Sequence, residues 1–287
     1  AACITSSMFL SALAPNLLAL GIVNSVTGIN ISWGTWFIAF LPVGLLLLLT
    51  MPLLAYWFYP PEVKVNDEVP RWATAELAKL GRMSRHEILL LVFVCCALAM
   101  WIFAASFIEP AMAALLVVVL MLWTGVLNWN DITSNKPAWN TFAWFATLVA
   151  LADGLSRTGF IAWLGKEGAA LMGGISPGAA TIALLLAFYL LHYLFASTTA
   201  HTTALLPAML TIGAAIPGIN MQVFCLLMVT SLGVMGIITP YGTGPSPIYY
   251  GSGYLPTKDY WRLGTIFGAI FLIALLVIGY PWMAMMF

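Results

Sequence analysis

The stretch that decides the fold is GIITPYGTGPSP, residues 236–247, which lies within a long apolar region. Three prolines and three glycines in twelve residues cannot form a continuous helix. The apolar run that begins near Met221 is nevertheless long enough to enter a membrane. A helix that starts there must therefore unwind at residues 236–247, so that its first half offers free carbonyls and its second half offers free N–H groups.

A second polar stretch, FASTTAHTT at residues 195–203, also interrupts apolar sequence. Ser and Thr are favoured N-caps, so we expect a hairpin tip here, with the positive end of the next helix directed into the protein. Residues 168–257 contain no Asp, Glu, Lys or Arg. Hydroxyls and helix N-termini without a carboxylate favour an anion. The alternative for these polar residues is a role in helix packing.

Composition places the chain in a membrane. Apolar residues make up 62% of the sequence and charged residues 7%, whereas a soluble domain has about 25% charged residues. The sequence therefore predicts an all-α, polytopic membrane protein with lipid around it. The net charge of zero gives no indication of a nucleic-acid partner. The four cysteines lie in apolar stretches and are interpreted as packing residues.

Further apolar runs predict the remaining spans, at residues 33–58, 88–108, 111–127, 139–164 and 260–287. The loop at residues 59–87 contains five basic residues and is expected in the cytoplasm. Alternation then places residues 128–137 and 258–262 on the same side, with eight of the ten Lys and Arg residues inside. This topology requires residues 176–218 to enter and leave on one side as a re-entrant hairpin.

Five motifs together resemble one known family: HYLFAS (192–197), TTAHTTA (198–204), GIITPYGTGP (236–245), YGSGY (250–254) and KDYWRLG (258–264). They are similar to the divalent anion:sodium symporter family, and most similar to its citrate, tartrate and 2-oxoglutarate/malate exchangers. The resemblance covers nearly the whole chain.

The resemblance implies a fold of two inverted repeats, each with a re-entrant hairpin and a broken helix. Residues 1–24 would be the end of the first broken helix, and residues 25–127 would be scaffold helices. Residues 128–250 would form the second transport region, with its hairpin at about 176–218 and its broken helix at about 221–250. The last transmembrane helix would be residues 251–287. The chain is then expected to be a C-terminal fragment that lacks the first hairpin tip, from a homodimer in a bacterial inner membrane.

Carried over to this sequence, the resemblance and the two polar stretches give these candidate substrate-binding residues: Asn16, Ser197, Thr198, Thr199, His201, Thr239, Pro240 and Thr243. Sodium-coupled members would place Na⁺ at Ser197, Ile238 and Thr239. Thr198 stands where the family has Asn, which weakens the case for sodium. We therefore expect anion exchange without a cofactor, with sodium-coupled dicarboxylate symport as the alternative.

The ionisable residues near these stretches are interpreted as follows. His201 follows the tip and could donate a hydrogen bond to a substrate carboxylate, whereas His192 precedes the tip on an apolar helix and is interpreted as a packing residue. Asp153 and Arg157 are four residues apart and share a helix face, so we interpret them as a structural ion pair.

Other function classes have less support. The sequence contains no His-Glu-x-x-His, no Gly-x-Ser-x-Gly and no paired aspartates, so we do not expect a membrane-embedded enzyme. An anion channel is a further alternative, but a hairpin tip and a broken helix suit alternating access better. The expected function is secondary active transport of citrate, tartrate, succinate, malate or 2-oxoglutarate, by exchange.

Overall fold

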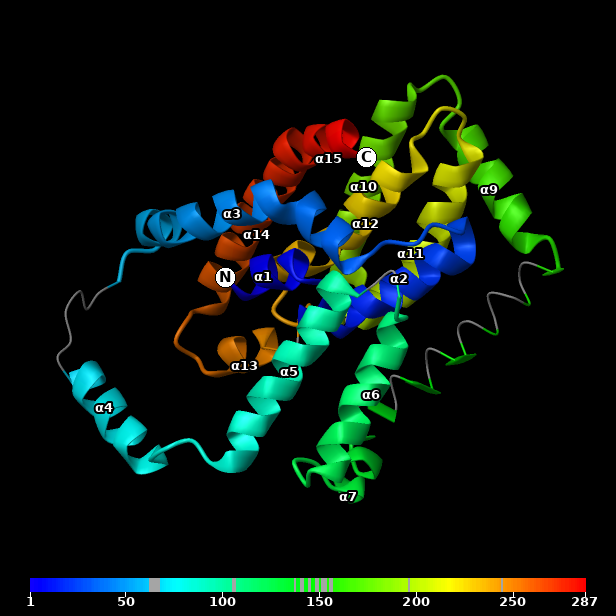
Figure 1. Cartoon of the computed structure of the whole chain (residues 1–287). Coiled ribbons are helices and arrows are strands. Elements are labelled where there is room, and N and C mark those ends of the chain that lie inside the picture. The colour runs from blue at the N-terminus through cyan, green and yellow to red at the C-terminus, as the bar shows by residue number, and fades with distance from the viewer. Residues whose placement is uncertain are drawn as a thin grey trace. The chain divides into compact units, whose positions relative to one another are not determined.

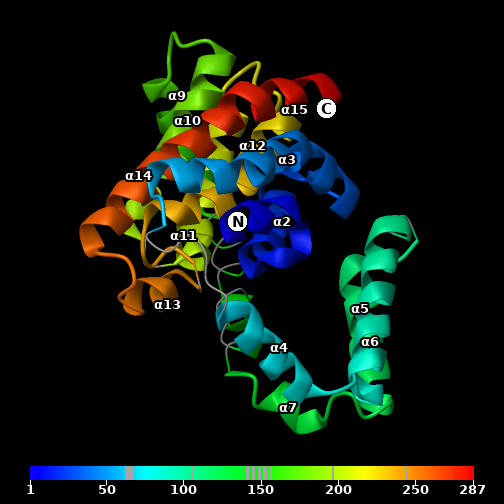
Figure 2. The ribbon, with the colours of Figure 1, turned by 90° about the vertical axis from the view of Figure 1, so that its left-hand side faces the viewer.

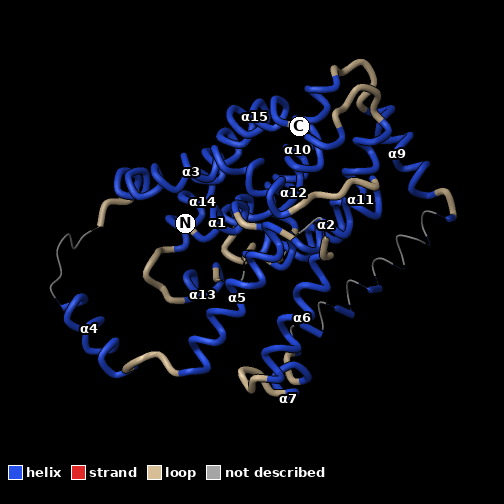
Figure 3. The backbone as a smooth tube through the Cα atoms, in the orientation of Figure 1, coloured by secondary structure: helices blue, strands red, loops and turns tan. Residues whose placement is uncertain are grey.

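The structure is a computed structural model that describes residues 1–61, 68–104, 107–136, 138–139, 142–143, 146–147, 150, 154, 157–195, 197–243 and 245–287. Every regular element within these residues is a helix (Figure 3). In chain order these elements are α1 (Ala2–Met8), η1 (Leu10–Ala12), α2 (Ala14–Thr27), α3 (Trp33–Phe58), α4 (Glu68–Leu80), α5 (Arg85–Phe103), α6 (Pro110–Trp123), α7 (Trp129–Thr133), α9 (Phe160–Leu171), α10 (Pro177–Leu191), η2 (His192–Leu194), α11 (Thr198–Ala215), α12 (Met221–Met235), η3 (Gly236–Ile238), α13 (Ser246–Gly251), α14 (Thr257–Ala274), η4 (Leu275–Gly279) and α15 (Tyr280–Met286). The all-α prediction is confirmed.

Among the residues that the structure describes, five helical segments are long and apolar enough to cross a membrane: Trp33–Phe58, Arg85–Phe103, Pro177–Leu194, Met221–Ile238 and Thr257–Met286. The prediction of a polytopic membrane protein is therefore confirmed at this level. The predicted span at residues 139–164 falls partly outside the described residues. Asp153, one member of the predicted ion pair, also lies outside them.

The chain forms two compact units, and the smaller one is Ala55–Phe142. Within it α5 and α6 lie side by side (Figures 1 and 2). Their contact contains the buried residues Ala97, Val117 and Met121. Ser84 starts α5 with a capping box, because its hydroxyl accepts from the amide of Glu87 while the Glu87 carboxylate accepts from the amide of Ser84.

The larger unit, Ala1–Leu54 with Ala143–Phe287, is built around α12. Every residue of α12 from Val223 to Met235 is buried. Helices α1, α2, α10, α11 and α14 pack against it, and Figure 1 shows α12 among these neighbours. A helix that is apolar on all sides belongs in the centre of such a bundle. The second polar stretch therefore follows directly from the most buried helix.

A hydrogen bond between helices repairs a proline defect in α3. Pro42 lacks the N–H that would bond to the Ile38 carbonyl. The indole Nε1 of Trp282, on α15, donates to that carbonyl at 2.8 Å. In lipid no water replaces a missing partner, so this indole stabilises the joint between α3 and α15.

Glycines on α14 bring η3 close to that helix. A Cβ atom on Gly268 would lie 2.4 Å from Cγ2 of Ile238, and one on Gly264 would lie 2.9 Å from the Ile237 carbonyl oxygen. Both spacings are shorter than ordinary contacts, so η3 lies against α14 only because these positions have no side chain. This close contact holds η3, the turn that begins the second polar stretch after α12, against α14.

Candidate functional site

The first polar stretch separates α10 from α11. After the 3₁₀ turn η2, Phe195 has extended backbone angles (φ −118°, ψ 129°), and Ser197 is extended too (φ −157°, ψ 151°). The Ser197 hydroxyl accepts a hydrogen bond from the amide of Ala200 at 3.1 Å and so caps the first turn of α11. The helical turn thus ends at Leu194, and helix resumes at Thr198, within the Ser-Thr cluster.

The second polar stretch separates α12 from α13. After η3, Thr239 is extended (φ −131°, ψ 148°). The hydroxyls of Thr243 and Ser246 are 2.6 Å apart, and Thr243 Oγ1 also accepts from the Ser246 amide at 3.3 Å. The Thr243 hydroxyl is therefore bonded to Ser246, the first residue of α13. This local role was not foreseen for a candidate substrate-binding residue.

The two stretches meet at Gly242. The amide of Thr198 donates to the Gly242 carbonyl at 3.2 Å, and its hydroxyl Oγ1 donates to the same oxygen. The carbonyl oxygen of Thr198 accepts from the Thr202 hydroxyl at 2.7 Å, which joins the next turn of α11 to the contact. Thr198 is buried. Two segments that are 44 residues apart are therefore joined through the first residue of α11.

A third break lies near the N-terminus, where the resemblance places the first broken helix. Helix α1 is followed by extended Phe9 (φ −114°, ψ 120°), η1 and then α2. The side-chain amide of Asn16 donates to the Ser6 carbonyl at 2.7 Å. Ser7 Oγ accepts from the Val234 amide at 2.9 Å, two residues before η3 begins. This bond connects the first break to the end of α12.

Buried polar atoms without a hydrogen-bond partner gather at these breaks. Among the described residues they are Asn16 Oδ1, Trp33 Nε1, both ring nitrogens of His192, both ring nitrogens of His201, and Thr239 Oγ1. Buried polar groups in proteins nearly always have a partner, from the protein or from something bound to it. The arrangement therefore provides positions for water, an ion or a polar substrate.

The two histidines have different surroundings. Both are fully buried, with ring centroids 5.1 Å apart in a T-shaped arrangement. The ring of His201 also has Phe188 at 4.3 Å and Phe195 at 5.2 Å, so aromatic rings surround it. The ring of His192 reaches the second break instead, because a Cβ atom on Gly242 would lie 2.6 Å from its Nε2. His192 is thus closer to the second polar stretch than its sequence position on an apolar helix indicated.

The other predicted site residues are placed as follows. Thr239 and Pro240 are buried, and Ser197 and Thr199 are half-buried at the start of α11. Ile238 is buried with its side chain against Gly268 of α14. The structure thus brings Thr198, Gly242 and Thr239 together, whereas Asn16 bonds within the first break.

An oxygen ligand for Na⁺ is present in Thr239 Oγ1, which is buried and unpartnered. Of the other two predicted Na⁺ ligands, the Ser197 hydroxyl already accepts from the Ala200 amide, and Ile238 has its side chain against Gly268. No group of three or more His, Cys, Asp or Glu that could hold a metal occurs among the residues that the structure describes. The sodium site remains a prediction.

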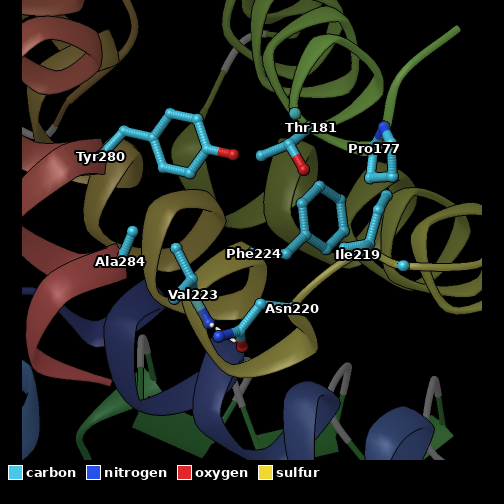
Figure 4. Close-up of a pocket in the computed structure, with 10 residues that line it drawn as sticks. Pro177, Thr181, Ile219, Asn220, Val223, Phe224, Tyr280 and Ala284 are labelled. Carbon is cyan, nitrogen blue, oxygen red and sulfur yellow. Dashed lines mark hydrogen bonds between the residues drawn. The ribbon is translucent and has the colours of Figure 1, made fainter.

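A cavity lies at the other end of α10 (Figure 4). Its volume is about 120 Å³, and it is lined by Pro177, Gly178, Thr181, Gly218, Ile219, Asn220, Val223, Phe224, Tyr280 and Ala284. Helix α10 has 15 residues, so its two ends are about 22 Å apart. The cavity is therefore separate from the unpartnered ring nitrogens of His192, which directly follows Leu191.

Known proteins are similar to this chain over nearly all of its residues. The family model described as the sodium:sulfate symporter transmembrane region matches residues 1–287. The L-tartrate/succinate antiporters of Shigella sonnei (strain Ss046) and Escherichia coli (strain K12) are each 50% identical to this chain over 281 residues. That of Escherichia coli (strain UTI89 / UPEC) is 51% identical over 283 residues.

These alignments cover 98–99% of this chain and 58% of each antiporter. The chain therefore spans a little over half the length of the relatives it matches. The match along its whole length confirms the resemblance drawn from the five motifs. This chain belongs to the sodium:sulfate symporter family, whose transmembrane region it matches from its first residue to its last.

Proposed function

We propose that the protein is a secondary carrier that exchanges dicarboxylate or tricarboxylate anions, with tartrate and succinate as the main pair. The observation that carries this proposal is the set of buried, unpartnered polar atoms where the chain breaks its helices. The 50% identity to L-tartrate/succinate antiporters supports the choice of substrates. The same evidence favours transport over catalysis.

The substrate would bind between the tip at Ser197–Thr199 and the break at Thr239–Pro240, with His201, Thr243 and Asn16 around it. No Lys or Arg occurs in residues 168–257, so within this stretch helix N-termini, hydroxyls and His201 would hold the carboxylates. Each helix terminus contributes roughly 0.3–1 kcal/mol, or up to about 2 kcal/mol when partly buried. Several such contacts bind an anion and still allow its release on the other side.

The inverted-repeat architecture of the family completes the proposal. Residues 176–218 would be a re-entrant hairpin, residues 221–250 the second broken helix, and residues 1–24 the end of the first. In support, each broken region consists of a helix, an extended residue and a second helix, and the Ser7–Val234 bond joins the two. Residues 25–127 would be a scaffold, and the protein would be a homodimer. Its location would be the inner membrane of a Gram-negative bacterium, because the relatives come from Gram-negative bacteria.

Exchange in proteoliposomes tests the function. The full-length protein is reconstituted, and uptake of labelled tartrate is measured with succinate inside the vesicles and with empty vesicles. An exchanger takes up label several-fold faster into succinate-loaded vesicles. Equal uptake into both would indicate a channel or a symporter and would contradict the proposal.

Sodium coupling is tested in the same vesicles, because Thr239 Oγ1 offers one unpartnered oxygen ligand. Uptake into succinate-loaded vesicles is compared in NaCl and in choline chloride. We expect the same rate in both salts. Uptake that requires Na⁺ and does not require internal succinate would replace exchange with sodium-coupled symport.

A further inference from the structure

His192 has an unusual position for a residue on an apolar helix. It begins the 3₁₀ turn η2, its side chain is fully buried, and both its ring nitrogens lack a partner. On one side its ring meets the edge of the His201 ring, with centroids 5.1 Å apart. On the other side its Nε2 approaches the backbone of Gly242 in the second break. A histidine that served only for packing would be expected to satisfy at least one nitrogen.

Two unpartnered atoms from different segments converge beside Gly242. A Cβ atom on Gly242 would lie 2.6 Å from His192 Nε2 and 2.6 Å from Thr239 Oγ1. Both atoms therefore lie around the position that a side chain of Gly242 would occupy, and neither has a hydrogen-bond partner. Thr239 comes from the second break and His192 from the turn before the hairpin tip. The two atoms therefore come together only in the folded protein, where the two segments meet.

The chemistry of this pair suits a hydroxyl group. A threonine hydroxyl can donate and accept, and a neutral imidazole nitrogen does one or the other according to its tautomer. A substrate hydroxyl likewise both donates and accepts, so it can match the pair in either tautomer. A carboxylate only accepts, and helix N-termini such as that of α11 already suit it.

We propose that His192 and Thr239 form a subsite for a hydroxyl group on the carbon chain of the substrate, so that His192 sets the preference for hydroxylated over plain dicarboxylates. His201 would act as a positioning residue, because its ring lies against that of His192. The proposal rests on the proposed exchange of dicarboxylates. It assigns to His192 a role that sequence reasoning gave to packing.

The test uses three four-carbon dicarboxylates that differ in their hydroxyls: tartrate has two, malate has one and succinate has none. The concentration for half-maximal exchange is measured for each with the full-length protein in proteoliposomes. His192→Phe keeps a ring and removes both nitrogens, whereas His192→Gln keeps a polar end. His86→Phe, at an exposed histidine outside the proposed site, is the matched control.

We expect His192→Phe to raise the half-maximal concentrations for tartrate and malate about tenfold, equivalent to about 1.4 kcal/mol, and that for succinate less than twofold. His192→Gln should recover part of the difference, and His86→Phe should match the wild type. An equal change for all three substrates, or no change, would overturn the subsite.

Thr239→Val provides a second route if His192→Phe does not fold. It removes only the hydroxyl and should shift the tartrate-to-succinate ratio in the same direction. A ratio that stays at the wild-type value in Thr239→Val would also overturn the proposal. Wild-type protein that exchanges none of the three substrates would refute the proposed function instead, so the two failures can be told apart.

Discussion

Gly242→Ala is the sharpest perturbation of the junction between the two polar stretches. The new Cβ atom would lie 2.6 Å from His192 Nε2, 2.6 Å from Thr239 Oγ1 and 2.9 Å from the Gly236 carbonyl oxygen. Gly242 does not have a positive φ angle, so alanine is compatible with the backbone at this position. The cost of the substitution is therefore steric.

The size of that cost follows from what can move. All three contacts are below 3.0 Å, a spacing that real Cβ atoms almost never show. One of them is to a backbone oxygen of η3, which lies close against α14 and cannot shift alone. Overpacking of a tightly packed site costs about 1–3 kcal/mol, which reduces the population of the intact junction about 5- to 150-fold.

Tartrate–succinate exchange is the assay, with Gly251→Ala as the matched control. Gly251 ends α13, and a Cβ atom there would meet nothing within 4 Å. We expect Gly242→Ala to lower the exchange rate at least fivefold at equal membrane content, and Gly251→Ala to leave it within twofold. If Gly242→Ala exchanges substrate at the wild-type rate, the contact between the two polar stretches is not part of the transport site.

Two further substitutions test other contacts. Trp282→Phe removes the donor to the Ile38 carbonyl and should lower the unfolding free energy by about 1–3 kcal/mol, measured as a lower midpoint of thermal unfolding in detergent. Thr198→Val removes one of the two hydrogen bonds to Gly242 and should slow exchange several-fold, whereas Thr203→Val, which loses a bond within its own helix, should not. Equal rates for the two threonine variants would remove the role given to Thr198.

Local chemistry made much of the fold predictable. The uncharged run at residues 33–58 is one helix with those ends, despite Pro42 and Pro52 within it. The prolines and glycines of residues 236–247 end α12 where the sequence indicated. Boundaries were less predictable, because the span expected from residue 88 begins at Arg85, after the capping box of Ser84.

Features that depend on tertiary contacts could not be predicted. The rings of His192 and His201 are in contact across the turn η2 and the start of α11, and sequence spacing on an apolar helix does not show that turn. The bond between Thr198 and Gly242 likewise joins residues that are 44 positions apart, so no local pattern indicates it.

Unpartnered polar atoms also bear on why such a carrier would exchange its substrates. A buried polar group that is left without a partner costs about 1–3 kcal/mol, and the described protein provides no partner for the ring nitrogens of His192 and His201 or for Thr239 Oγ1. A bound dicarboxylate that supplies partners removes this cost. In the proposed exchanger, the empty carrier would then cross the shielded state less readily than the loaded carrier. Exchange would be favoured over net uptake for this reason, and succinate-loaded vesicles are the condition in which the difference is measured.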